Sequence, residues 1–156
     1  MHITLRKAGP EDTGILHSMQ VKSFQPLLEI YRDFETSPAN EPLEKVEFRI
    51  NQPITDYYIL FNEGNPIGGI RIVKLEDKRY RVSPIFVLPE YQGNGIAQEV
   101  FRMAEQMYPD AKVWELDTIL EEKRNCHLYE KMGYKQTGKM KPVNEKMTIV
   151  FYEKRM

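Results

Sequence analysis

Hydrophobic and polar positions recur along this chain with two periods, and the change of period marks its elements. Alternation at period two predicts strands, whereas apolar residues three or four positions apart predict amphipathic helices. The predicted strands cover residues 2–6, 56–61, 67–75, 79–88, 112–119, 134–138 and 145–153. The predicted helices start at Gly9 and at Pro42 and, later in the chain, cover 96–107 and 122–132.

The first 50 residues contain two predicted helices with a long connection. The first helix is expected to bury Ile15, Leu16 and Met19. From Ser23 to Pro42, three prolines and mixed polarity predict a helix fragment followed by a long loop. The second helix is expected to bury Leu43, Val46 and Ile50.

The order β-α-α-β-β-β-α-β-α-β-β predicts an α+β fold. Short turns between the three middle strands favour antiparallel pairing, and the later strand–helix–strand unit adds a parallel neighbour. We therefore expect a mixed, mostly antiparallel sheet of about six or seven strands with helices on both faces. The 156 residues fit one domain, 1–156.

Composition and charge narrow the class of protein. A formal net charge of −1 gives no support for nucleic-acid or membrane-surface binding, which usually needs a basic patch. Cys126 is the single cysteine, so no intrachain disulfide can form, and a reducing cytoplasm is expected. The scattered histidines, with one cysteine, have no metal-ligand spacing, so no metal is expected.

Candidate chemistry lies where the strand 79–88 meets a helix through Gly93-Asn94-Gly95. A helix start leaves about four backbone N–H groups unpaired, and glycines let a ligand approach them closely. The turn is therefore a candidate phosphate cradle, with a plain strand-to-helix turn as the alternative. No Gly-Lys-Ser/Thr follows, and Gln98 stands where a dinucleotide fingerprint has its third glycine.

Residues 85–97 resemble the acyl-CoA signature of the GNAT N-acetyltransferase family, a strand ending in Val-x-Pro followed by Arg/Gln-x-x-Gly-x-Gly/Ala. The matching residues are Val87, Pro89, Gln92, Gly95 and Ala97. Residues 128–134, Leu-Tyr-Glu-Lys-Met-Gly-Tyr, are similar to the family's Leu-Tyr-Glu-Lys-x-Gly-Phe. The predicted element order over nearly the whole chain agrees with the family fold.

This resemblance implies that acetyl-CoA binds as the acyl donor. The diphosphate would lie on the amides of Gly93, Asn94, Gly95, Ile96 and Ala97, and Gln92 of the same motif is a further cofactor-binding candidate. In the family, two parallel strands splay apart, and the pantetheine bonds to the exposed strand end, here Phe86, Val87 and Leu88. The family often has an asparagine seven positions before the helix tyrosine. This chain has Glu122 there and Asn125 one turn later, and either is a candidate for the pantetheine arm.

Tyr129 is the candidate general acid, because a phenol can donate to a departing thiolate. The alternative is a core tyrosine with a satisfied hydroxyl. Candidate bases are Asp117 and Glu115, which share one face of their strand, with Asp117 nearer the expected site. Both could instead lie at an exposed strand end, and a water relay is a third route.

The expected function is direct transfer of an acetyl group from coenzyme A to a primary amine of a small molecule, peptide or protein. Acids at Glu29, Asp33 and Glu35 would suit a cationic amine acceptor, with a solvated charge cluster as the alternative. A non-catalytic acyl-CoA-binding or sensing module is the alternative from another class, and a nucleotide-phosphate binder is a third. The edge strand near the C-terminus is a candidate for pairing in a homodimer.

Overall fold

The computed structural model describes residues 1–156, and its elements follow the order predicted from the sequence. The strands are β1 (Ile3–Lys7), β2 (Thr55–Asn62), β3 (Asn65–Lys74), β4 (Arg79–Val87), β5 (Val113–Ile119), β6 (Lys135–Asn144) and β7 (Met147–Arg155). The helices are α1 (Thr13–Tyr31), α2 (Leu43–Asn51), α3 (Ile96–Met107) and α4 (Lys123–Lys131).

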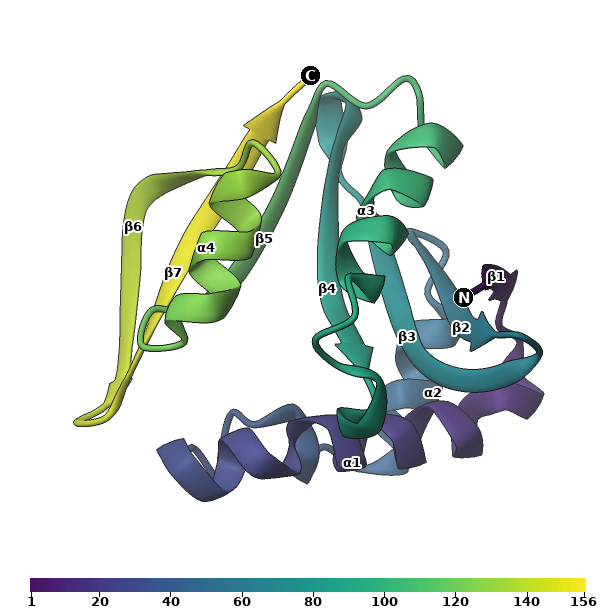
Figure 1. Ribbon diagram of the computed structural model, residues 1–156, viewed down its shortest axis with the longest axis horizontal. Helices are drawn as coiled ribbons and strands as arrows, with labels where there is room; N and C mark the ends of the chain where they lie inside the picture. The colour runs from purple at the N-terminus through teal and green to yellow at the C-terminus, as the bar shows by residue number, and fades with distance from the viewer.

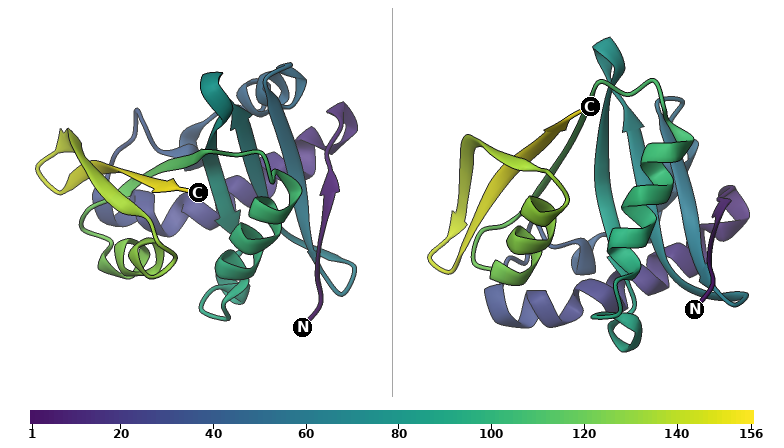
Figure 2. Two further views of the ribbon diagram at one scale, coloured as in Figure 1. Left: turned by 90° about the horizontal axis from the view of Figure 1, so that it is seen from above. Right: turned by 45° about the horizontal axis from the view of Figure 1, so that its top comes forward.

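One sheet of seven strands, in the order β1-β2-β3-β4-β5-β7-β6, organises the molecule (Figure 1). Every neighbouring pair is antiparallel except β4 and β5, which run parallel. Helices α3 and α4 pack on one face, and α1 and α2 pack on the other (Figure 2). The predicted α+β fold, with a mostly antiparallel sheet covered on both faces, is confirmed.

Two apolar clusters hold the layers together. The larger one joins α3 and α4 to the sheet and includes Trp114 and Phe101. The smaller one seats Leu16 of α1 and Val46 of α2 on Phe86 of β4. Two predicted core positions are wrong: Ile15 and Leu43 are 40% and 43% exposed. Ile15 lies beside the buried stripe of α1, and Leu43 is the first residue of α2.

Helix α1 is longer than the sequence predicts, since it continues through Pro26 to Tyr31. Proline inside a helix removes one hydrogen bond and costs about 3 kcal/mol, so other contacts must hold the last turns. The Tyr31 hydroxyl donates to Glu122 at 2.6 Å, and the Asn144 amide donates to the Tyr31 carbonyl at 2.9 Å. The predicted loop is correspondingly shortened to residues 32–42.

Strand β6 forms one edge of the sheet, and almost all its side chains are exposed. Lysines at 135, 139 and 141 and a proline at 142 lie along it, which are residue types that discourage pairing between edges. No helix in the structure combines the length and the hydrophobicity needed to span a membrane.

Gly68 permits the close approach of β3 to β4, because a Cβ there would lie 2.1 Å from the Phe86 carbonyl oxygen. We expect Gly68→Ala to lower the free energy of unfolding by about 2 kcal/mol or more, since backbone must move. Gly14→Ala is the control: this exposed position in α1 has open space, so alanine should raise stability by about 0.5–1 kcal/mol. Denaturant unfolding measures both, and equal stability of Gly68→Ala and the parent would contradict the assignment.

Candidate active site

Strands β4 and β5 pair over only three residue pairs, from Arg79 with Val113 to Arg81 with Glu115. Beyond these pairs both strands continue without pairing to each other, so β4 from Val82 and β5 from Leu116 diverge. Figure 1 shows the two strands together at one end and apart at the other, with α1 lying across the open end. The splay expected from the resemblance is therefore present.

A bulge in β4 accompanies the divergence. Ile70 pairs with Ile85 and Ile72 with Val82, so Arg71 of β3 faces both Ser83 and Pro84. The Arg71 guanidinium donates to the Ser83 carbonyl at 2.8 Å and to the Gln52 side chain at 2.8 Å. Burial, followed by the nearby positive charge of Arg49, lowers the pKa of Arg71 to about 10. Arg71 thus holds the bulged backbone from the α1 and α2 side.

Val87, the last residue of β4, points its backbone groups into the splay. The N–H of Leu88 donates to the Ile67 carbonyl of β3 at 2.8 Å, and neighbouring residues of a strand alternate in direction. The N–H and carbonyl of Val87 therefore face away from β3, toward the diverging β5. The Gln92 side chain donates to the Val87 carbonyl at 2.8 Å, which leaves the Val87 N–H as the donor available there.

A run of unpaired amides follows in the glycine turn. Gly93 and Gly95 have φ of 83° and 75°, a conformation that favours glycine. The first helical hydrogen bond of α3 runs from Glu99 N–H to the Gly95 carbonyl, and no amide from Gly93 to Gln98 has an acceptor in the chain. No side chain caps α3 either. These unpaired donors and the helix dipole fit an anion such as a diphosphate.

Tyr129 belongs to α4, and its side chain packs against α3. Its ring meets Phe101 of α3 edge-on at 5.7 Å between ring centroids. Its hydroxyl has no hydrogen-bond partner, and it is not sealed from solvent like the unpaired hydroxyls of Tyr57 and Tyr134. Burial first, and then the negative charge of Asp117, raise the pKa of Tyr129 to about 12. The phenol is thus neutral and has a free donor.

Asp117 and Glu115 lie on the face of β5 opposite Trp114, Leu116 and Thr118, as the alternation predicts. Glu115 belongs to the paired part of β5 and accepts from Arg79 at 2.9 Å. Asp117 lies in the divergent part, where Arg81 of β4 donates to it. Burial raises the pKa of Asp117, although Arg81, Lys141 and Lys139 oppose the rise.

The two candidates for the pantetheine arm differ in availability. The Glu122 carboxylate already accepts the Tyr31 hydroxyl, whereas the Asn125 side chain is half-buried and has no hydrogen bond. Cys126 is buried in the larger core cluster, and its thiol points at the Ile119 and Leu120 carbonyls at 3.6 and 3.7 Å. His127 is exposed.

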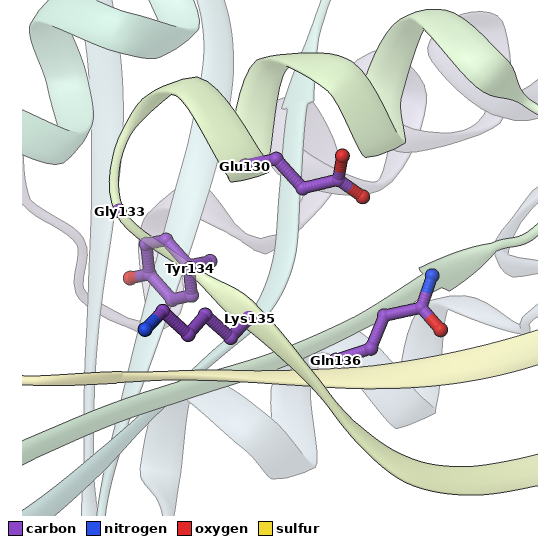
Figure 3. A pocket seen from close by; sticks show the side chains of 5 residues that line it. All are labelled: Glu130, Gly133, Tyr134, Lys135 and Gln136. Atoms are coloured by element: carbon purple, nitrogen blue, oxygen red, sulfur yellow. The ribbon is translucent and has the colours of Figure 1, made fainter.

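A pocket of about 450 Å³ lies away from these groups, where the C-terminal end of α4 meets β6 (Figure 3). Glu130, Gly133, Tyr134, Lys135 and Gln136 line it. The Tyr152 hydroxyl donates to Glu130 at 2.7 Å and accepts from Gln136 at 3.1 Å, so two of the polar lining side chains are joined within the protein. None of the residues predicted for the active site lines this pocket.

Three contributors to the site were not predicted from the sequence. The Gln98 amide extends the run of free donors, Arg71 holds the β4 bulge, and Arg81 holds Asp117. The free amide of Gln98 could have been predicted, because a helix start leaves about four backbone N–H groups unpaired. Arg71 and Arg81 act on residues of other strands, and no local pattern identifies such partners.

Comparisons with known proteins agree with this architecture. The family model described as "Acetyltransferase (GNAT) family" matches residues 24–134. Uncharacterized protein YrkN of Bacillus subtilis (strain 168) is 28% identical over 110 residues, which are 69% of this chain and 59% of YrkN. This chain therefore spans less than two thirds of that relative.

Solved structures share the fold at low sequence identity. The ribosomal-protein-S18-alanine N-acetyltransferase of Escherichia coli has a TM-score of 0.79 at 10% identity, with 99% of this chain and 94% of that chain covered. A chimera of the spermidine N-acetyltransferase SpeG from Vibrio cholerae and hSSAT has a TM-score of 0.78 at 17% identity, with 99% and 96% covered. The family match spans most of the chain, and the splayed strands and glycine turn lie within it: the chain belongs to the GNAT acetyltransferase family.

Proposed function

We propose that this protein is an acetyl-CoA-dependent N-acetyltransferase that moves the acetyl group directly from coenzyme A to a primary amine. The observation that carries the proposal is the run of free amides from Gly93 to Gln98, next to a splayed strand pair. The amides would bind the diphosphate, and the pantetheine would take the place of the missing β4–β5 hydrogen bonds. The free Asn125 side chain is the better placed of the two candidates for the pantetheine arm.

The Val87 N–H supplies the electrophilic part of the reaction. An amide that faces the splay and has no partner in the chain can donate to the thioester oxygen as negative charge develops on it. Gln92 fixes the Val87 carbonyl at 2.8 Å and thereby the orientation of this strand end. Because the donor belongs to the backbone of a strand that pairs with β3, it needs no reorganisation during the reaction.

Asp117 serves as the general base and Arg81 as its positioning residue. Asp117 shares the sheet face on which α1 and α2 pack, and we assign acceptor entry to that side. The amine nitrogen attacks the thioester carbon and loses a proton to Asp117, and the carbon–sulfur bond then breaks. Burial raises the pKa of Asp117 and so makes its carboxylate a better proton acceptor than an ordinary aspartate.

Tyr129 acts on the leaving sulfur. With a pKa of about 12 the phenol stays protonated, and its donor has no other partner. A free thiol has a pKa near 8.5, so complete transfer from this phenol is uphill. Tyr129 therefore stabilises the departing thiolate chiefly by a hydrogen bond, and solvent reprotonates the phenol when the proton moves to sulfur.

The acceptor is a primary amine of a small molecule or of a peptide or protein. Structures with the same fold include enzymes named for spermidine and for a ribosomal-protein alanine. A second pocket of about 350 Å³ is lined by the connection from α1 to α2 and by Lys45 of α2. Glu35 on this pocket and Glu29 on α1 are exposed, which suits a cationic acceptor, whereas Asp33 is buried beside Thr36.

Ligand binding tests the first requirement of the proposal, which is that the protein binds acetyl-CoA. Acetyl-CoA at about 100 times its dissociation constant should raise the free energy of unfolding by about 2.7 kcal/mol. ATP and NAD should give smaller shifts, because they lack the pantetheine arm. Thermal unfolding with each ligand, together with thiol release across an amine panel, separates three cases. Equal shifts indicate a nucleotide binder, and a shift specific to acetyl-CoA without amine-dependent thiol release indicates a sensor.

Tyr129→Phe should lower kcat about 10²- to 10⁴-fold, because the departing sulfur loses its donor, with coenzyme affinity nearly unchanged. Tyr134→Phe is the matched control, since Tyr134 lies on the same side of the sheet but its hydroxyl is sealed. It should keep the parent kcat. Steady-state rates and coenzyme titrations measure both variants, and full turnover by Tyr129→Phe would remove this residue from the mechanism.

Asp117→Asn should lower kcat/KM about 10²- to 10⁴-fold and remove one limb of the pH–rate profile. Because the pKa of Asp117 is raised, the parent rate should fall as pH drops through a value above the ordinary aspartate range. Glu115→Gln should keep that limb, since Glu115 is paired with Arg79 in the undiverged part of β5. The ionisation of the acceptor affects all three profiles alike. An unchanged limb in Asp117→Asn would point to a water relay.

A further inference from the structure

Arg124 reaches the glycine turn from the opposite side of the splay. It lies in the first turn of α4, which follows β5, and it is exposed. A Cβ placed on Gly93, which follows β4, would lie 2.9 Å from one terminal nitrogen of the Arg124 guanidinium. Arg124 therefore bridges the segments that follow the two diverging strands, at the level of the free amides.

This guanidinium is unusual in the chain because it has no protein partner. Every other arginine bonds to a carboxylate or a carbonyl or stacks on an aromatic ring: Arg6, Arg32, Arg49, Arg71, Arg79, Arg81, Arg102 and Arg155. Arg124 instead lies beside Gly93 to Gln98, whose amides are also donors without acceptors. A cation next to a run of N–H groups is unfavourable unless an anion lies between them.

We propose that Arg124 is a coenzyme-binding residue that pairs with the coenzyme diphosphate from the α4 side, while the amides bind it from the turn. The inference rests on the proposed function. A guanidinium offers a planar fork of donors that matches two phosphate oxygens, which a lysine ammonium cannot do. The guanidinium lies beside Gly93, whose amide is the first of the run proposed to bind the diphosphate, so we assign the diphosphate rather than the 3′-phosphate on the ribose as its partner.

The position of Arg124 also explains why residue 93 has no side chain, in addition to the backbone conformation that favours glycine there. Gly93 has φ of 83°, and its missing side chain leaves the space that the Arg124 guanidinium approaches. Arg124 thus joins α4, which carries Tyr129, to the turn that binds the phosphates. Coenzyme binding would couple the two sides of the splay.

The test compares R124Q, R124K and the neighbouring charge control K123Q by calorimetric titration with coenzyme A and with 3′-dephospho-coenzyme A. K123Q removes the same charge one position away, from an exposed lysine with no ion pair. R124Q should bind both ligands about 10- to 100-fold more weakly than the parent, with R124K intermediate and K123Q within about threefold. Thermal unfolding of the unliganded variants should match the parent, since the Arg124 side chain bonds to nothing.

Each other outcome overturns the inference in a recognisable way. A loss confined to coenzyme A assigns Arg124 to the 3′-phosphate. An equal loss in K123Q indicates a general field effect, and unchanged affinity in R124Q removes the contact altogether. These three results leave the proposed function standing. A parent protein that binds neither ligand would overturn the proposed function, and the inference with it.

Discussion

The limited pairing of β4 with β5 is the constraint on which the candidate site depends. After three residue pairs the strands separate, and the backbone of β4 is left without a neighbour on one side. Polar backbone groups seldom remain unpaired inside a protein, so a splayed strand implies a ligand that supplies hydrogen bonds. Arg71 stabilises the bulge on one side of β4, and Gln92 orients its last carbonyl. The divergence is therefore built into the fold rather than left as an unfilled gap.

The two ends of the candidate site have different electrostatic environments. At the glycine turn, free amides, the α3 dipole and Arg124 concentrate positive potential where phosphates would lie. At the reacting end, burial raises the pKa values of both Tyr129 and Asp117, so the phenol stays neutral and the carboxylate becomes more basic. The same physical cause, loss of hydration, thus favours opposite roles in two side chains.

Helix α1 shows how tertiary contacts override local propensity. Pro26 and the polar residues near it favour an early end of the helix, yet the helix continues to Tyr31. The last turn is held by Glu122, next to the start of α4, and by Asn144 at the end of β6. These contacts lay α1 across the open end of the splay, so a helix that was expected to be short extends past both diverging strands (Figure 1).

The element order, the strand-to-helix turn at Gly93-Asn94-Gly95 and the candidacy of Tyr129 could all be predicted from the sequence. These depend on hydrophobic period, on glycine conformations and on short motifs, all of which act over a few residues. The tertiary structure alone decided the length of α1, the different surroundings of Asp117 and Glu115, and the position of Arg124 beside Gly93. Those features depend on distances between residues far apart in the chain, which only the packed sheet and helices define.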